Sequence, residues 1–348
     1  MARDALPAPQ TNVVLSASAA VFGLTLLIQQ SVSNRLAALF LIGTALGIVL
    51  YHSVFGFTSA FRVLLTDGRS AGFRAQLIML GSACLLFFPA LAGGMLFGQP
   101  VAGNISPVGV SVVFGSFIFG VGMQLGGGCA SGTLFTAGGG SVRMLFTLLF
   151  FIIGSVLGVM HQAWWKALPS IEPVSMVDAL GWLPALALNL SVFALAYFTV
   201  ARIERRRHGE VESISHIKNA SWFHGPWPLL AGGVALALLN FTTLYLSGKP
   251  WGITSAFGLW GGMALQTIGM PVETWPGFAA PAMQKSLNSS LLSDTTSVMD
   301  FGIILGALLA AGLARKFNPV WRIPWPHLAA SVLGGLLLGY GARLAYGC

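Results

Sequence analysis

The sequence predicts an all-α polytopic membrane protein made of two inverted halves. Of the 348 residues, 55% are hydrophobic and 8% are charged, and the mean hydropathy is +0.79. A water-soluble protein of this length needs far more charge to cover its surface. Two different motifs also occur twice along the chain, in the same order each time. These observations place the chain in a bilayer and indicate an internal duplication, which in membrane proteins is typical of a transport pathway.

The two repeated motifs can be aligned residue by residue. The segment Phe55–Phe61, of sequence FGFTSAF, returns as Trp251–Phe257, of sequence WGITSAF. The longer motif runs from Pro107 to Cys129 and returns without a gap from Pro326 to Cys348. In the longer pair, Gly115 aligns with Gly334, Gly122 with Gly341, Gln124 with Arg343, Gly128 with Gly347 and Cys129 with Cys348.

About nine apolar runs approach the ~20 residues that a spanning helix needs. They cover residues 12–29, 36–54, 75–97, 108–125, 142–163, 180–201, 227–247, 299–314 and 327–346. Residues 1–35 are expected to form an extra helix, because the first run lacks a signal-peptide cleavage site. The first repeat half is then 36–201, the polar stretch 202–226 is a linker, and the second half is 227–348.

The basic residues predict the orientation of these helices. If the linker is cytoplasmic, alternating the spans places twelve Lys and Arg residues inside and four outside, namely Arg35, Lys166, Lys249 and Lys285. This is a strong positive-inside bias. The same alternation sends the two halves through the membrane in opposite directions. The net charge of +8 is therefore spread over loops, which does not favour nucleic-acid binding.

The shorter motif predicts a half-inserted, or re-entrant, helix in each half. A glycine opens each copy, and Thr58 and Ser59, or Thr254 and Ser255, follow where hydroxyls could cap the first N–H groups. Inside a membrane such an end must be buried in protein or line a wet cavity. The alternative is that these small residues serve only close helix packing.

The longer motif predicts a broken helix at a binding site. Three consecutive glycines from Gly126 to Gly128 should end the spanning helix and leave backbone N–H groups free to bind an anion. Cys129 then lies at the break, with Ser131 and Thr133 close by. Gly347 and Cys348 hold the equivalent positions in the second half. Cys84, within a Leu-rich run, is expected to be a packing residue.

No enzyme site is predicted. The three cysteines form no CxxC pair and no metal-ligand spacing, and the residue types of hydrolytic catalysis do not accompany them. We expect no metal and no cofactor. Arg62 and Arg343 fall in the membrane zone, where a charged side chain is costly and is therefore a candidate for function. The alternative is that these long side chains extend to the membrane interface.

Gly120–Thr133 and Gly339–Cys348 resemble the two Gly-Cys signatures of the YeeE/YedE sulfur-transport family. The resemblance covers the chain from about residue 36 to the end. It implies a bacterial inner-membrane permease without enzymatic activity, in which cysteines pass a small sulfur-containing anion, most simply thiosulfate, along a central path. Cys129 and Cys348 would be two of those cysteines. A soluble cytoplasmic sulfur-carrier protein is a further possible partner.

Two positions depart from the family pattern. Family members that carry thiosulfate commonly have another cysteine in the first short motif, where this chain has Gly56. The second half also stops at Cys348, so a truncated chain is expected. A non-transporting partner of a sulfur carrier and a membrane thiol oxidoreductase are the alternative functions; the second requires that Cys129 and Cys348 meet.

Overall fold

The computed structural model describes residues 8–215 and 221–347, and most of these residues are in α-helices. The α-helices are α1 (Thr11–Ser31), α2 (Asn34–Ser53), α3 (Phe57–Thr66), α4 (Ala71–Gly93), α5 (Val110–Gly126), α6 (Ala130–Gly138), α7 (Val142–Lys166), α8 (Met176–Leu180), α9 (Trp182–His208), α10 (Leu229–Ser247), α11 (Thr254–Thr267), α12 (Pro281–Leu287), α13 (Thr295–Leu313) and α14 (Trp325–Leu344). The 3-10 turns are η1 (Val272–Thr274) and η2 (Leu291–Ser293). The strands form two antiparallel pairs, β1 (Met95–Leu96) with β2 (Gln99–Pro100) and β3 (Val108–Gly109) with β4 (Ser170–Ile171). The all-α prediction is confirmed.

Eight helical stretches in the described residues are long and apolar enough to cross a membrane, so the chain is a multi-pass membrane protein. Two of these stretches contain a break: Asn34–Thr66 joins α2 to α3, and Val110–Gly138 joins α5 to α6. About nine membrane spans were expected, and eight candidates are found among the described residues. A helix, α14, does form where the ninth was expected, but Pro326, His327 and Arg343 make it less apolar than the other eight.

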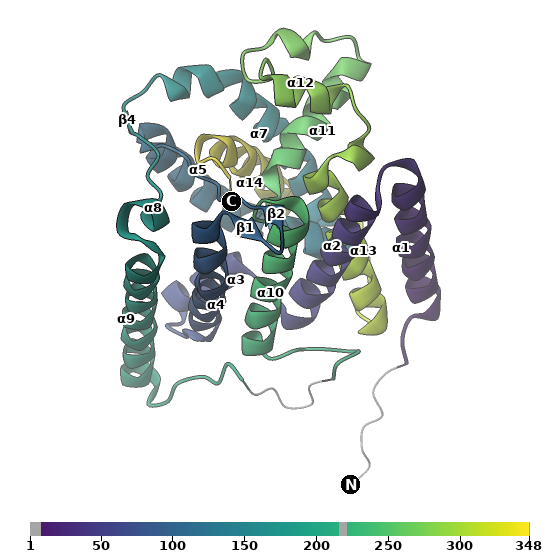
Figure 1. Cartoon of the computed structure of the whole chain (residues 1–348). Helices are drawn as coiled ribbons and strands as arrows, with labels where there is room; N and C mark the ends of the chain where they lie inside the picture. Colours follow the sequence, from purple (N-terminus) through teal and green to yellow (C-terminus); the bar gives the residue numbers. More distant parts are fainter. Residues whose placement is uncertain (1–7, 216–220, 348) are drawn as a thin grey trace.

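The long helices stand side by side with their loops at two ends (Figure 1). The polar chain that follows α9 lies at one end, and α12 lies at the other. Helix α1, which was expected as an extra N-terminal helix, packs on α2 and α13 at the edge of the bundle. The arrangement leaves α2, α7, α13 and α14 in the centre, where the largest fully buried side chains gather.

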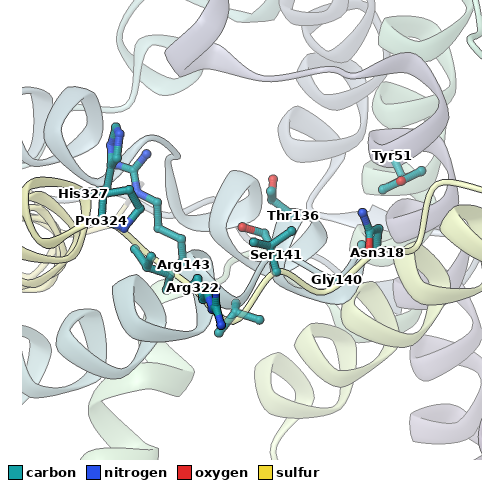
Figure 2. A pocket seen from close by; sticks show the side chains of 13 residues that line it. Tyr51, Thr136, Gly140, Ser141, Arg143, Asn318, Arg322, Pro324 and His327 are labelled. Carbon is teal, nitrogen blue, oxygen red and sulfur yellow. The ribbon is translucent and has the colours of Figure 1, made fainter.

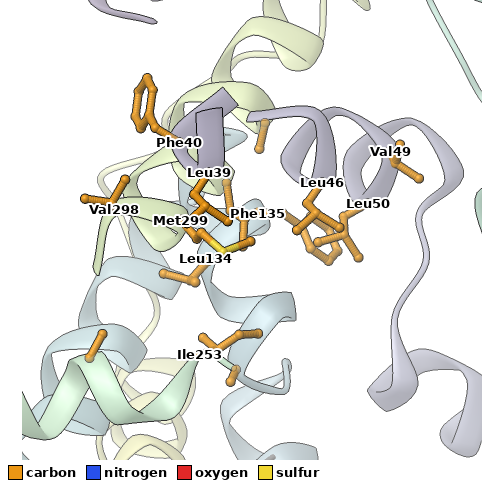
Figure 3. Packing of buried hydrophobic residues seen from close by; sticks show 14 of the residues in the cluster. Leu39, Phe40, Leu46, Val49, Leu50, Leu134, Phe135, Ile253, Val298 and Met299 are labelled. Atoms are coloured by element: carbon orange, nitrogen blue, oxygen red, sulfur yellow. The ribbon is translucent and has the colours of Figure 1, made fainter. Parts of the chain in front are cut away.

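The central apolar cluster joins helices from both ends of the sequence (Figure 3). Phe40 and Leu46 of α2 lie with Leu134 of α6 and Met299 of α13, all within 1% of complete burial. Phe151 of α7 meets Phe257 of α11 edge to face, with ring centroids 4.7 Å apart. The cluster fixes the two short helices α6 and α11 against the long helices around them.

Glycines let α2 and α13 approach until their backbones touch. A Cβ added at Gly43 or Gly47 of α2 would overlap a carbonyl oxygen of α13, and one added at Gly306 would overlap the carbonyl oxygen of Thr44. A Cβ at Gly302 would lie 2.5 Å from the carbonyl oxygen of Phe40. Small residues at such contacts are the usual basis of tight helix packing in membranes. The two helices form one rigid pair.

Helix α14 makes similar contacts on two sides. Towards α5, a Cβ at Gly341 would lie 2.6 Å from the carbonyl oxygen of Gly115, and one at Gly122 would lie 2.9 Å from that of Gly334. Towards α7, a Cβ at Gly335 would lie 2.5 Å from the carbonyl oxygen of Thr147. These contacts hold the end of α5, and therefore the break after it, in a fixed place.

Helix α9 continues to His208, beyond the point where a linker was expected. The carboxylate of Glu204 is fully buried and accepts hydrogen bonds from Ser70, through both its N–H and its hydroxyl, and from the N–H of Glu212. Arg69 and Arg74 form ion pairs with it at 3.4 and 3.6 Å. The contacts of Glu204 thus connect the end of α9 to the start of α4.

We expect Gly306→Ala to destabilise the protein by about 1–3 kcal/mol, because the new methyl group overpacks the contact between α2 and α13. Thermal unfolding of the detergent-purified chain measures the change. Gly23→Ala is the matched control, since nothing lies within 4 Å of the position its Cβ would take. The control should keep or raise the midpoint; equal loss in both variants would contradict the role of this contact.

Candidate functional site

A cavity of about 340 Å³ lies where two broken helices meet. It is lined by both repeated motifs of the first half, with Gly56, Thr58 and Ser59 from one and Gly128 and Cys129 from the other. Tyr51, Thr136 and Lys316 complete its polar lining. None of the lining residues is acidic, and Lys316 contributes a positive charge. The cavity therefore suits a small anion.

The break at this cavity follows from the glycines. Helix α5 ends at Gly126, as the sequence predicted, and Gly127 turns the chain with a φ of +84°. A side chain is disfavoured in that left-handed conformation, whereas glycine adopts it readily. Helix α6 then starts at Ala130, with Cys129 as its N-cap.

Cys129 itself caps the new helix. Its sulfur accepts a hydrogen bond from the N–H of Gly132 at 3.4 Å and lies 3.4 Å from the hydroxyl of Ser131. The hydroxyl of Thr133 donates to the carbonyl oxygen of Cys129 at 2.8 Å. Only 3% of the residue is exposed. The thiol therefore sits at the positive end of a helix dipole, on the wall of the cavity.

The hydroxyl caps predicted for α3 and α11 are not present. Neither helix has a side-chain cap, because α3 begins after Gly56 and α11 after Ile253. The hydroxyl of Ser59 instead donates to the carbonyl oxygen of Gly56 at 3.1 Å. Thr58 is buried, and its hydroxyl has no hydrogen-bond partner among the described residues. A lining hydroxyl is thus left available to a bound molecule.

Two arginines close the end of α5. Arg62 donates to the carbonyl oxygen of Gln124 at 2.8 Å and to its side chain at 3.1 Å, and Arg143 donates to the carbonyl oxygen of Leu125 at 3.0 Å. Cations are stabilising at a helix C-terminus, where the last carbonyl groups lack helical partners. Arg62 is exposed and does not line the cavity.

The candidate residues of the second half form a separate group. Arg343 of α14 donates to the carbonyl oxygens of Thr254 at 2.9 Å and Ser255 at 3.0 Å. The hydroxyl of Ser255 donates to Thr296 at 3.0 Å. Gly347 is described but does not line the cavity at Cys129, and Cys348 lies outside the described residues.

A second cavity, of about 400 Å³, lies near the end of α14. It is lined by Tyr346, which aligns with Gly127 in the repeat, and by Lys166, Ser106 and Ser111. The hydroxyl of Ser111 donates to the carbonyl oxygen of Leu344 at 2.8 Å. Like the cavity at Cys129, this one contains a lysine and no acidic residue. Cys84 lines a different cavity together with Asn104 and Asn240.

A third cavity, of about 440 Å³, adjoins the one at Cys129 and shares Tyr51 and Thr136 with it (Figure 2). Its lining includes Arg143, Arg322 and His327, again with no acidic residue. The first residues of α7 and of α14 contribute to it, so the N-terminal ends of two long helices add to the positive potential.

Sequence reasoning missed Lys316, Tyr51 and Thr136. Lys316 was counted only as a loop charge, because nothing in its local sequence places it beside Cys129. It also passed over Asp300, the one charged residue within α13. An acidic residue inside an apolar run is a visible signal and could have been found. No group of three or more metal-ligating side chains occurs within the described part of the chain.

We expect Gly258→Ala to destabilise the protein by about 1.5–3 kcal/mol, the usual range for a lost hydrogen bond to a charged group. A Cβ at Gly258 would overlap the Arg343 guanidinium and push it from Thr254 and Ser255. Gly252→Ala is the control, as nothing lies within 4 Å of its added Cβ. In thermal unfolding, Gly258→Ala should lower stability much less in an Arg343→Met background than in the parent chain. An equal loss of stability in both backgrounds would contradict an effect of Gly258→Ala through Arg343.

Comparison with known proteins identifies the family of this chain. The chain matches the sulphur transport family over residues 52–348. It is 30% identical to the thiosulfate transporter TsuA of Spirochaeta thermophila over 330 residues, covering 88% of this chain and 87% of that one. It is 26% identical over 320 residues to the Escherichia coli protein of the same name, covering 88% and 83%. A shorter match, 30% over 130 residues, covers 37% of this chain and 31% of the E. coli probable transporter YedE. The chain therefore belongs to the sulphur transport family, whose members are membrane transporters and not enzymes.

Proposed function

We propose that this protein is a permease that carries thiosulfate across the bacterial plasma membrane. The observation that carries the proposal is the thiol of Cys129, held at the start of α6 on the wall of an anion-attracting cavity. Relatives that match 88% of the chain are named thiosulfate transporters. The sequence contains no nucleotide-binding P-loop, so transport depends on a gradient or on consumption of the substrate.

The lining of the cavity matches the two ends of thiosulfate. The anion has a soft terminal sulfur and three harder oxygens. A thiol is a weak donor suited to sulfur, whereas the hydroxyl of Thr58 and the ammonium group of Lys316 suit oxygen. Gly56 stands where a further family cysteine was expected, so Cys129 provides the only thiol among the described residues of this cavity.

We further propose that the two halves are inverted repeats, and the glycine contacts support this. Gly115 aligns with Gly334 and Gly122 with Gly341 in the sequence. In space the pairs are crossed, because Gly341 packs on Gly115 and Gly122 packs on Gly334. The first glycine of each motif copy thus packs on the second glycine of the other copy. A two-fold axis between the halves produces this crossed pairing.

A second pair of contacts supports the same axis. Gln124 donates to the carbonyl oxygen of Thr58 at 3.3 Å, and Arg343 donates to that of Thr254 at 2.9 Å. Gln124 aligns with Arg343, and Thr58 with Thr254. On this view, 36–201 and 227–348 are the two halves, 202–226 is the linker, and α3, α6 and α11 are re-entrant helices.

The cavities at Tyr346, at Cys129 and at Arg143 suggest a route for the anion. In the proposed orientation Lys166 faces the outside and Lys316 the cytoplasm, so the anion enters at Tyr346 and reaches Cys129 before it leaves. The adjoining cavity with Arg143 and Arg322 is then the cytoplasmic exit. Binding of the anion by Cys348 stays a prediction from its place in the repeat, because the residue lies outside the described structure. A soluble sulfur-carrier protein could receive the anion at that exit.

The orientation can be tested by cysteine labelling in a background whose native cysteines are replaced by serine. A membrane-impermeant maleimide added to intact cells should label Lys285→Cys, which is exposed on the outer loop, but not Arg206→Cys. Permeabilised cells should label both. The reverse pattern in intact cells would contradict the proposed orientation.

The role of the thiol can be tested by thiosulfate uptake in cells that lack other transporters. We expect Cys129→Ser to reduce the rate roughly tenfold, as a lost interaction of about 1.4 kcal/mol would do, because oxygen is a poorer match for the terminal sulfur. Cys84→Ser, in another cavity, should change little. Parent rates in both Cys129→Ser and Cys129→Ala would remove any direct role of the thiol.

A further inference from the structure

Asp300 is a carboxyl group in the interior of a membrane helix, with no role in the route described above. It is the one charged residue within α13, a helix long and apolar enough to span the bilayer. The residue is 0% exposed, and neither of its oxygens has a hydrogen-bond partner among the described residues. Buried polar groups are nearly always paired, and a charge buried alone is particularly costly. Such a residue in a membrane segment points to function.

None of the described elements that pack closely on α13 places a cation against this carboxyl group. Helices α1, α6 and α11 and the turn η2, which pack on α13, contain no acidic, basic or histidine residue. Helix α2 has Arg35 in its first turn and Tyr51 and His52 in its last, but it meets this part of α13 through Gly43. The nearest charged residue along the chain is Asp294, the N-cap of α13, and it has the same sign. A carboxylate buried without a partner is costly, so this structure favours the uncharged acid at Asp300.

Two polar side chains, Asp294 and Ser297, precede Asp300 at the start of α13, and no hydrogen bond joins them to Asp300 in the described structure. Asp294, Ser297 and Asp300 are three residues apart and share one face of the helix. The carboxylate of Asp294 accepts hydrogen bonds from the N–H and the hydroxyl of Ser297, both at 2.7 Å. Trp260 donates to the same hydroxyl at 2.8 Å.

Burial increases along this face. Asp294 is half-buried, whereas Ser297 and Asp300 are both fully buried. Beyond Asp300 the same face continues with Ile303 and Ala307, which are apolar. The polar part of this face thus starts at one surface and ends inside the protein. In the proposed orientation that surface is the outer one.

We propose that Asp300 is the proton-binding site that couples uptake of the anion to the proton gradient, which rests on the permease function proposed above. A proton from water at the Asp294 side binds the Asp300 carboxylate and gives the neutral acid, which the protein interior can bury. When the site opens to the cytoplasm, the same proton leaves and the carboxylate is restored. Nothing is oxidised or reduced, and the only bond made and broken is that between the proton and oxygen.

The test uses the full chain in proteoliposomes with radiolabelled thiosulfate and with the membrane potential held at zero. Two measurements are compared: exchange of thiosulfate at equal pH, and accumulation driven by a pH gradient. A gradient of about one unit allows about tenfold accumulation for each coupled proton. We expect Asp300→Asn, which mimics the neutral acid, to keep exchange within about twofold but to lose accumulation completely. Asp300→Glu, which keeps a carboxyl group, should retain part of the exchange and part of the accumulation.

Asp178→Asn is the matched control, since Asp178 is exposed on α8, and it should behave as the parent chain. A pH-sensitive dye inside the vesicles gives a readout that needs no variant, because thiosulfate entry should acidify the interior. Normal accumulation by Asp300→Asn, absence of acidification in the parent, or accumulation driven by a sodium gradient alone would each overturn the proposal. Absence of exchange in the parent would instead reject the permease function.

Discussion

The close approach of helix backbones through glycine is the constraint on which the rest of this structure depends. In lipid, helices gain little from burying apolar side chains against one another, so they associate through close contact and hydrogen bonds. Here α14 lies against α5 on one side and α7 on the other, and α13 lies against α2. These contacts allow no room for a methyl group, and they hold broken helices in place that would not be stable alone.

A broken helix inside a membrane leaves backbone groups that must find partners. The carbonyl oxygens at the end of α5 bind Arg62 and Arg143, and the first N–H groups of α6 are met in part by the sulfur of Cys129. Arg343 instead donates to carbonyl oxygens in the first turn of α11, those of Thr254 and Ser255. Arg62, one of the two charges that seemed expensive in the sequence, therefore pairs with backbone that the break after α5 exposes, as does Arg143.

The polar groups left over after this pairing are the ones to which we assign function. Thr58 and Lys316 face the cavity at Cys129, and Asp300 lies buried without a partner in the described structure. The first group is positive and attracts an anion, whereas Asp300 is an acid with no ion-pair partner among the described residues. Their separation suits a transporter in which anion and proton bind at different places and are linked by the movement of rigid helix pairs.

The sequence by itself determined the membrane environment, the positions of most helices and the break after Gly126, because these depend on local hydropathy and on the backbone preferences of glycine. It also identified Cys129, since a repeated motif marked it. It could not predict that Lys316 lies beside Cys129, that Arg343 binds Thr254, or that Asp300 has no partner. Those facts depend on which helix faces meet across contacts between residues far apart in the chain. Only the tertiary structure decides that, because hydropathy places a residue along a helix but does not specify its neighbours.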